Sequence, residues 1–209
     1  MSTETHWWWI RHAPVIDHGG RIYGQRDMAC DTSDTAAMSW LAAALPEDAV
    51  WVTSHLRRAI DTAAAIVAAG LEAPEPIIER DLAEQNFGDW QGLAWDELRA
   101  AGKPDYDAFW DDPGNTPPPG GESLAQVIAR VSTVIEHLTV EHAGRDIVAV
   151  THGGTIRSAL ALALTLEPVR MIGFMIDNLS LTHIDHISEG ILAGRGTAWR
   201  VMTENAQPR

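Results

Sequence analysis

The sequence has a single cysteine among its 209 residues, and it has little positive charge. Cys30 alone cannot form a disulfide within the chain, so we expect a reducing compartment and a passive free thiol. Fifteen lysines and arginines stand against 29 aspartates and glutamates, which gives a formal net charge of −14. Because nucleic acids and anionic membrane surfaces attract basic proteins, this acidity argues against both as partners.

Long apolar runs and several familiar catalytic motifs are also missing. No stretch approaches the roughly 20 apolar residues of a transmembrane helix, and the first six residues are polar and acidic, so we expect a cytoplasmic protein. The chain has no P-loop, no glycine-rich dinucleotide fingerprint, no Gly-x-Ser-x-Gly elbow and no Cys-x-x-Cys pair. ATP hydrolysis, dinucleotide redox chemistry and serine esterase chemistry therefore lack their usual parts.

Two histidine-bearing signatures stand out against these absences. Arg11-His12-Ala13 follows an apolar run at 7–10, and Thr151-His152-Gly153-Gly154 follows another at 147–150. Short runs rich in β-branched or aromatic residues are typical of buried strands, so each histidine falls where a strand ends. At such ends of parallel strands, helix N-termini turn free N–H groups toward an anion. The pair indicates a phosphoryl-transfer site in which histidine is the nucleophile.

Strand-like and helix-like segments alternate, which is typical of an α/β fold, a three-layer α/β/α sandwich with a mostly parallel central sheet. We expect a single domain, 1–209, in which residues 85–121 form a small lid insertion followed by a long amphipathic helix. Strands are predicted near 6–11, 49–53, 146–151 and 179–185, and helices near 33–45, 56–70 and 154–166. A last edge strand is expected over 198–202, with a loose tail after Thr203.

Motifs in the same order over nearly the whole chain resemble those of the histidine phosphatase superfamily, in its phosphoglycerate-mutase-like branch. The two histidine signatures are similar to the family's Arg-His-Gly motif and to its second histidine motif. Further matches are Gly24 with Asp27, Ser54-x-Leu56-x-Arg58-Ala59, Leu82-x-Glu84-x-x-x-Gly88-x-Trp90, Gly121-Glu122-Ser123-Leu124 and Asn178-x-Ser180. Ala13 and Pro14 depart from the pattern, and the loop 15–23 lacks an asparagine that many relatives place on the phosphate.

The resemblance implies a role for each site residue. His12 would attack phosphorus to give a phosphohistidine, a covalent relay that splits one difficult displacement into two. Arg11, Arg58, His152 and the backbone of Gly153 would bind the phosphoryl group, with His152 protonated in the substrate complex. Glu84 would donate a proton to the leaving alkoxide and then take one from water. Because protein cations supply the positive charge, the resemblance implies neither a metal nor a cofactor.

The lid suggests the substrate class. The chain lacks the extra length of cofactor-dependent mutases, and the lid from Asp96 to Glu122 carries seven acids: Asp96, Glu97, Asp105, Asp107, Asp111, Asp112 and Glu122. Such a lid should repel polyanions, so we expect a small monophosphorylated metabolite with a neutral, aromatic or cationic remainder. α-Ribazole phosphate is one candidate, and the broad-specificity phosphatases are similar in character. The lid tryptophans Trp90, Trp95 and Trp110 either line a substrate pocket or pack within the insertion.

Other readings stay open at this point. A mutase-type phosphotransferase and a non-catalytic relative that binds a phosphorylated ligand or protein are alternatives to the phosphomonoesterase. His183 and Asp185 share a strand face where metal ligands could lie, but no third ligand is evident, so no metal site is predicted. The apolar stretch 172–176 is interpreted as an edge strand or a contact in a homodimer.

Overall fold

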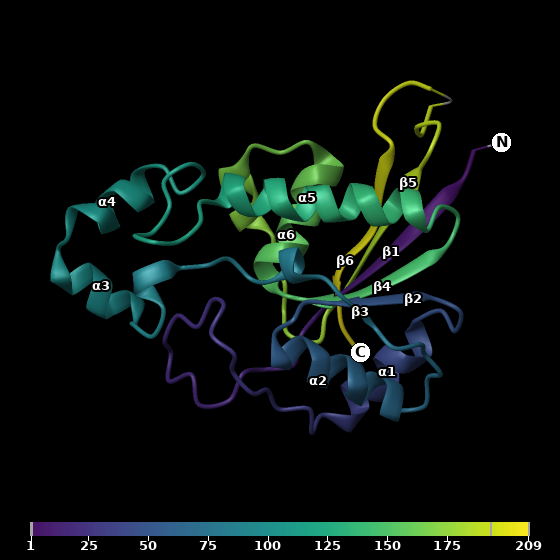
Figure 1. Ribbon diagram of the computed structural model, residues 1–209, viewed down its shortest axis with the longest axis horizontal. Helices are drawn as coiled ribbons and strands as arrows, with labels where there is room; N and C mark the ends of the chain where they lie inside the picture. Colours follow the sequence, from purple (N-terminus) through teal and green to yellow (C-terminus); the bar gives the residue numbers. More distant parts are fainter. Residues whose placement is uncertain (1, 193, 209) are drawn as a thin grey trace.

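The computed structural model describes residues 2–192 and 194–208. They contain a six-stranded sheet in the order β3-β2-β4-β1-β5-β6 (Figure 1). The parallel strands are β1 (Glu4–Arg11), β2 (Val50–Thr53), β3 (Ile77–Ile78) and β4 (Asp146–Thr151). Antiparallel pairing adds β5 (Leu181–Ile187) beside β1 and β6 (Trp199–Ala206) at the edge. The predicted fold class is confirmed.

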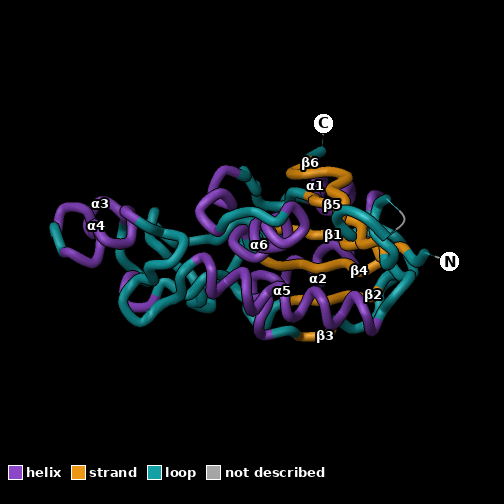
Figure 2. Tube along the Cα trace, turned by 90° about the horizontal axis from the view of Figure 1, so that it is seen from above, coloured by secondary structure: helices purple, strands orange, loops and turns teal. Residues whose placement is uncertain are grey.

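Helices cover both faces of this sheet, which makes the three layers (Figures 1 and 2). One face carries α5 (Leu124–Glu141) and α6 (Gly153–Leu164), and the other carries α1 (Thr35–Ala44) and α2 (Arg57–Ala68). α5 begins with a capping box, in which Ser123 Oγ accepts from Gln126 N and Gln126 Oε1 accepts from Ser123 N. The N-cap of α1 is Asp34, whose side chain accepts from Ala37 N at 2.9 Å.

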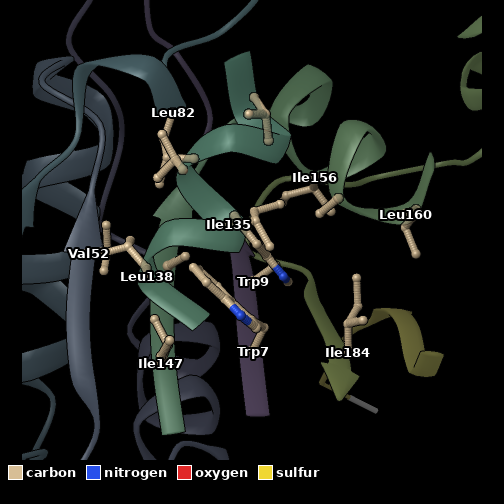
Figure 3. Packing of buried hydrophobic residues seen from close by; sticks show 14 of the residues in the cluster. Trp7, Trp9, Val52, Leu82, Ile135, Leu138, Ile147, Ile156, Leu160 and Ile184 are labelled. Atoms are coloured by element: carbon tan, nitrogen blue, oxygen red, sulfur yellow. The ribbon is translucent and has the colours of Figure 1, made fainter. Parts of the chain in front are cut away.

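The tryptophans of the strands are mainly core residues, as predicted. Trp7, Trp9 and Trp51 are no more than 1% exposed, and the rings of Trp7 and Trp9 stack with centroids 4.7 Å apart. Figure 3 shows these two rings among Ile135, Leu138 and other apolar side chains of the α5 and α6 layer. Large buried rings on a central strand anchor that strand firmly, so the residues that follow it are held in fixed positions.

A small lobe stands away from the sheet (Figure 1). It contains η2 (Gly88–Trp90), α3 (Trp95–Ala101) and α4 (Pro104–Asp111), and it is reached through η1 (Arg80–Leu82). The lobe has its own buried cluster of four side chains, Ile22, Trp90, Leu98 and Phe109. These elements fall inside the predicted insertion 85–121, and we interpret the lobe as the lid.

Two details of the sequence prediction are wrong. The tail is ordered beyond Thr203, because β6 pairs as far as Ala206 with Leu181, and Asn205 N donates to Thr182 Oγ1. The stretch 172–176 is not an edge strand. Its first two residues end the 3₁₀ helix η3 (Pro168–Gly173), and the carbonyls of Phe174 and Ile176 accept from arginines. Within the two described stretches, no helix combines the length and the apolar character that crossing a bilayer requires.

Candidate active site

The carboxyl ends of β1 and β4 bring the two histidine signatures together. The strands are parallel neighbours in which Arg11 pairs with Thr151, so His12 and His152 leave the sheet side by side. Their ring centroids lie 5.2 Å apart, and both side chains are fully buried. The topology thus places the two predicted histidines in one site.

The His12 ring is held with a lone pair available on Nε2. Its Nδ1 lies 2.7 Å from the Ala13 carbonyl oxygen, so Nδ1 carries the proton and donates it to that oxygen. Burial, and after it the charge of Arg58, lowers the pKa of His12 to about 3, so the ring is neutral at pH 7. Asn178 Nδ2 donates to the His12 carbonyl at 2.7 Å and fixes the backbone. A neutral imidazole with an unprotonated Nε2 is chemically suited to act as a nucleophile.

Arg58 is fully buried beside that nitrogen. Its Nε donates to His12 Nε2 at 3.2 Å, and its Nη atoms donate to the carbonyls of Arg26 and Gly24 at 2.8 and 2.7 Å. Among the ion pairs of the described residues, none joins Arg58 to a carboxylate. A buried cation without a direct ion pair is costly, so this position favours an anionic ligand.

His152 faces the same space from the start of α6. Its Nε2 lies 2.7 Å from Ser54 Oγ, which itself accepts from Leu56 N. The Ser54 hydroxyl can therefore donate to Nε2 and leave the proton on Nδ1, which is buried without a hydrogen-bond partner. Burial, and then Arg58, lowers the pKa of His152 well below its usual value. The ring is neutral without ligand, and its expected protonation would need the charge of a bound phosphate.

Arg11 also carries an unused donor. Its Nη1 donates to the Ile176 carbonyl at 2.6 Å, whereas its Nε is buried without a partner. Gly153 lies against it, and a Cβ there would stand 3.6 Å from both Arg11 Nε and Arg157 Nη1. Two guanidinium groups thus flank the first turn of α6, where backbone N–H groups have no partner within the helix. A tetrahedral anion could satisfy these donors together.

Glu84 supplies the carboxylate of the site. Its Oε1 accepts from Gln85 N at 2.9 Å and from Gly154 N at 3.0 Å. Any Cβ at residue 154 would collide with that oxygen, so the glycine is required for the approach. Arg130 of α5 donates to the Glu84 carbonyl at 3.1 Å and holds the segment in place. We call Arg11, His12, Arg58, Glu84 and His152 the sheet-edge cluster.

A cavity of about 440 Å³ opens beside Glu84 and Gly154, and we call it the lid cavity. Polar groups on its wall include Arg21 and Arg157. Its apolar lining is unusually aromatic and consists of Ile22, Tyr23, Phe87, Trp95, Phe109, Trp110, Leu124, Met171 and Ile172. Two of the three lid tryptophans therefore line the cavity, whereas Trp90 is 5% exposed and packs inside the lobe. The cavity can hold the alcohol portion of a phosphate ester.

The acids of the lid lie away from the lid cavity. None of the seven lid acids lines the lid cavity. Glu122 accepts from Arg130 and from Asn86 N, Glu97 pairs with Arg21, and Asp96 pairs with Arg99. The others are exposed on the lobe surface. Repulsion by these acids therefore does not shape the cavity wall, and its aromatic lining becomes the stronger argument about the substrate.

Sequence reasoning gave no role to two residues that the structure places here. Arg157 stands one helical turn after Gly153 on α6, lines the lid cavity and donates to the Phe174 carbonyl at 2.9 Å. Its spacing of four residues from a predicted phosphate contact was the available signal, because such residues share a helix face. Ser54 was part of a matched motif, but its contact with His152 depends on the pairing of β2 with β4.

The charges of the site suit an anion better than a metal ion. Three guanidinium groups, those of Arg11, Arg58 and Arg157, lie around the histidines and would repel a cation. Of the described residues, the three histidine and carboxylate donors that are gathered closely enough for a metal lie at the other end of β1. The sheet-edge cluster can thus hold an oxyanion near a neutral histidine and a carboxylate.

Comparison with known proteins gives a consistent result. A family model described as the histidine phosphatase superfamily, branch 1, matches residues 7–195. Glucosyl-3-phosphoglycerate phosphatase of Mycolicibacterium vanbaalenii is 37% identical over 173 residues, 77% of this chain and 74% of that protein. Metal-independent phosphoserine phosphatase of Arabidopsis thaliana is 33% identical over 162 residues, 75% and 67% of the two chains. The match with phosphoglycerate mutase-like protein 4 of Arabidopsis thaliana, 40% identical over 107 residues, spans 51% of this chain and 46% of that protein.

Solved structures agree with this picture. Mycobacterial glucosyl-3-phosphoglycerate phosphatase has a TM-score of 0.78 at 26% identity and covers 99% of this chain and 100% of its own. A putative α-ribazole-5′-P phosphatase from Escherichia coli has a TM-score of 0.81 at 21% identity, with 97% and 96% covered, and supports the fold alone. The resemblance drawn from the motifs is confirmed, and the predicted enzyme class agrees with the names of these relatives.

Proposed function

The chain belongs to the histidine phosphatase superfamily, and we propose that it is a metal-independent phosphomonoesterase in which His12 forms a phosphohistidine. The observation that carries the proposal is the set of buried donors without partners. Among the described residues, Arg11 Nε and His152 Nδ1 have no acceptor, and Arg58, which donates to His12 and to two carbonyls, forms no ion pair with a carboxylate. Native proteins rarely leave buried donors unsatisfied, so these groups in the same site as His12 support a phosphoryl group as the natural occupant.

The first step is attack by the lone pair of His12 Nε2 on phosphorus. A bond forms between Nε2 and phosphorus while the bond from phosphorus to the ester oxygen breaks. The Arg58 hydrogen bond, now 3.2 Å long to Nε2, passes to a phosphoryl oxygen. Arg11 and His152 bind the remaining charge, which rests on three equatorial oxygens in a loose transition state. His12 Nδ1 keeps its proton and donates its hydrogen bond to the Ala13 carbonyl oxygen, which stabilises the phosphorylated ring.

Glu84 handles the protons of both steps. In its protonated form it gives a proton to the leaving alkoxide, and the resulting carboxylate then takes one from the attacking water. Water forms the new bond to phosphorus, the bond to Nε2 breaks, and inorganic phosphate and neutral His12 remain. General acid–base help of this kind contributes roughly 10²- to 10⁴-fold to the rate.

The lid cavity favours esters of apolar or aromatic alcohols. Its opening at Glu84 and Gly154 puts the alcohol portion of the substrate on the side where Glu84 would donate its proton. Aromatic rings bind a flat apolar group through large contact areas, and Arg157 adds positive charge at the wall, where Arg21 is already paired with Glu97. The substrate we propose is therefore a small monophosphate with an apolar or aromatic body. α-Ribazole phosphate, whose base is aromatic, is one candidate of this kind. Glucosyl-3-phosphoglycerate and phosphoserine, which the names of relatives suggest, have polar bodies and are the alternatives to test against it.

The test is phosphate release from a panel of monophosphates in excess EDTA. The panel contains α-ribazole phosphate, glucosyl-3-phosphoglycerate, phosphoserine and aryl phosphates, and the variants are His12→Ala and the matched control His137→Ala on the exposed side of α5. We expect turnover that survives EDTA, is lost in His12→Ala and persists in His137→Ala. Transfer of phosphate to a second metabolite in place of water would indicate a mutase. Binding without turnover would indicate a non-catalytic relative, and either result would overturn the proposal.

A further inference from the structure

A second cluster of ligand-type side chains lies at the opposite end of β1 from His12. The topology adds His6 of β1 to the pair His183 and Asp185 of β5, which the sequence placed on one strand face. One donor atom from each of the three residues lies within 4.8 Å of the others. His6 is six residues before His12, about 20 Å along an extended strand, so this cluster is separate from the sheet-edge cluster.

Asp185 is the centre of this group. Its carboxylate is 4% exposed, and Oδ1 lies 2.7 Å from His6 Nδ1 and 2.9 Å from His183 Nε2. In the described part of the chain it pairs with these two imidazoles and with no lysine or arginine, although Arg200 stands opposite on β6. A buried carboxylate that is held by two imidazoles and by no lysine or arginine is a common arrangement around a bound metal ion.

The His183 ring is oriented before any ligand arrives. It stacks on Trp8 with ring centroids 3.8 Å apart and planes 13° apart, and Trp8 Nε1 donates to Asp146 Oδ1 at 2.8 Å. His183 Nε2 is buried and forms no well-aligned hydrogen bond, in spite of its 2.9 Å distance from Asp185 Oδ1. A nitrogen that faces an anionic oxygen without alignment is satisfied by a cation placed between them.

We propose that His6, His183 and Asp185 bind one zinc-type divalent ion, with water completing the coordination. Two imidazoles and a carboxylate are a common donor set for such ions, and donors around a tetrahedral zinc stand about 3.3 Å apart, given bonds of about 2.0–2.1 Å. The present distances of 2.7 and 2.9 Å therefore need to grow by only about half an ångström. His6, 32% exposed, gives the ion a route from solvent.

The bound ion would link strands β1 and β5 and would take no part in catalysis. His6 and Asp185 are direct partners across β1 and β5, and so are Trp8 and His183. An ion held by both strands stabilises the native state by mass action, because the unfolded chain does not present the three donors together. At a hundredfold excess of ion over its Kd, we expect Tm to rise by roughly 5 °C or more.

The test is a titration of the full chain, first stripped with EDTA and desalted, with Co²⁺ followed by its visible absorption and then with Zn²⁺ by displacement. We expect one equivalent to bind. Because His6 and Asp185 are ligands, His6→Gln and Asp185→Asn should weaken binding by roughly 10- to 100-fold or more. The control His186→Gln changes a histidine of the same strand that packs on Trp199, and it should leave binding unchanged.

A metal could also bind at the active-site histidines, and the variant His12→Ala distinguishes that location from the proposed site. One equivalent should still bind in His12→Ala, with the Tm rise retained. Absence of saturable binding in the wild type would contradict the metal site, and so would His6→Gln binding as tightly as wild type or loss of the equivalent in His12→Ala. None of these results depends on phosphatase activity.

Discussion

The sheet-edge cluster and the lid cavity fix their side chains by different means. In the cluster, polar atoms of the arginines and histidines are held by backbone carbonyls and by hydroxyls at strand ends, and the histidines and Arg58 are fully buried. In the lid cavity, aromatic rings meet edge to face within a small lobe, and Trp110 is 48% exposed. The difference suggests that the sheet sets the chemistry and that the lid sets the preference for the alcohol portion of the substrate.

Changes in the sheet-edge cluster should therefore affect every substrate. Arg58→Met removes the buried charge beside His12, and we expect kcat/KM to fall by roughly 10³-fold on all esters tested. Arg57→Gln is the matched control, because Arg57 is exposed and pairs with Asp61 on the surface. Steady-state kinetics on an alkyl and an aryl phosphate measure both variants. A loss confined to one ester, or an equal loss in the control, would break the comparison.

Glu84→Gln tests the part of the cluster that acts on the leaving group. The glutamine oxygen can still accept from Gln85 N and Gly154 N, so the side chain should stay in place. An alkyl phosphate, whose alkoxide needs a proton, should lose roughly 10²-fold in kcat, whereas p-nitrophenyl phosphate should lose far less. Single-turnover kinetics on the two substrates give the ratio. Equal losses on both would remove Glu84 from the role of general acid.

Changes in the lid cavity should depend on the substrate instead. Trp110→Ala removes an aromatic wall, and we expect KM for naphthyl phosphate to rise roughly tenfold while kcat changes little. A small alkyl phosphate that does not reach the wall should show no change in KM. Trp40→Ala, on α1 away from the cavity, is the control. A fall in kcat for both substrates would mean that the lid also positions the phosphate.

Acid should weaken the buried cluster, because His12 must then take up a proton without solvent. Because the pKa of His12 is about 3 in the folded chain and about 6.5 when unfolded, the unfolded state binds more protons between these values. The stability from neutral His12 is present above pH 6.5 and is lost as the pH falls toward 3, by up to about 1.4 kcal/mol per pH unit. Melting curves from pH 7 to 4 should show a shallower decline in His12→Gln than in wild type. Parallel curves would contradict the assignment.

The part of the fold that follows from local pattern could be predicted from the sequence. Apolar runs that end in polar signatures gave the strand ends of β1 and β4, and parallel pairing then brings Arg11, His12 and His152 together. Ser123 and Gln126 have the spacing of a capping box, so the sequence itself marks the start of α5. Such signals come from residues that are neighbours in the sequence, so they can be recognised without knowing which distant segments meet in the fold.

What could not be predicted depends on contacts between distant segments. His6 joins Asp185 only because β5 pairs antiparallel with β1, and the acids of the lid were counted without knowing which way they point. Glu122 is the clearest case, because it pairs with Arg130 of α5 and does not line the cavity. The number of charged residues in a segment therefore does not show which of them line a cavity that the segment covers.

The central claim is a covalent bond between His12 and phosphorus, and rapid quench with a labelled substrate tests it directly. Wild-type protein is mixed with ³²P-labelled ester for milliseconds, denatured at alkaline pH, digested and examined by mass spectrometry. We predict a phosphoryl group that is stable to base and labile to acid on the peptide that contains His12, absent from His12→Ala. Turnover without such a label, or a label on His152, would contradict the account.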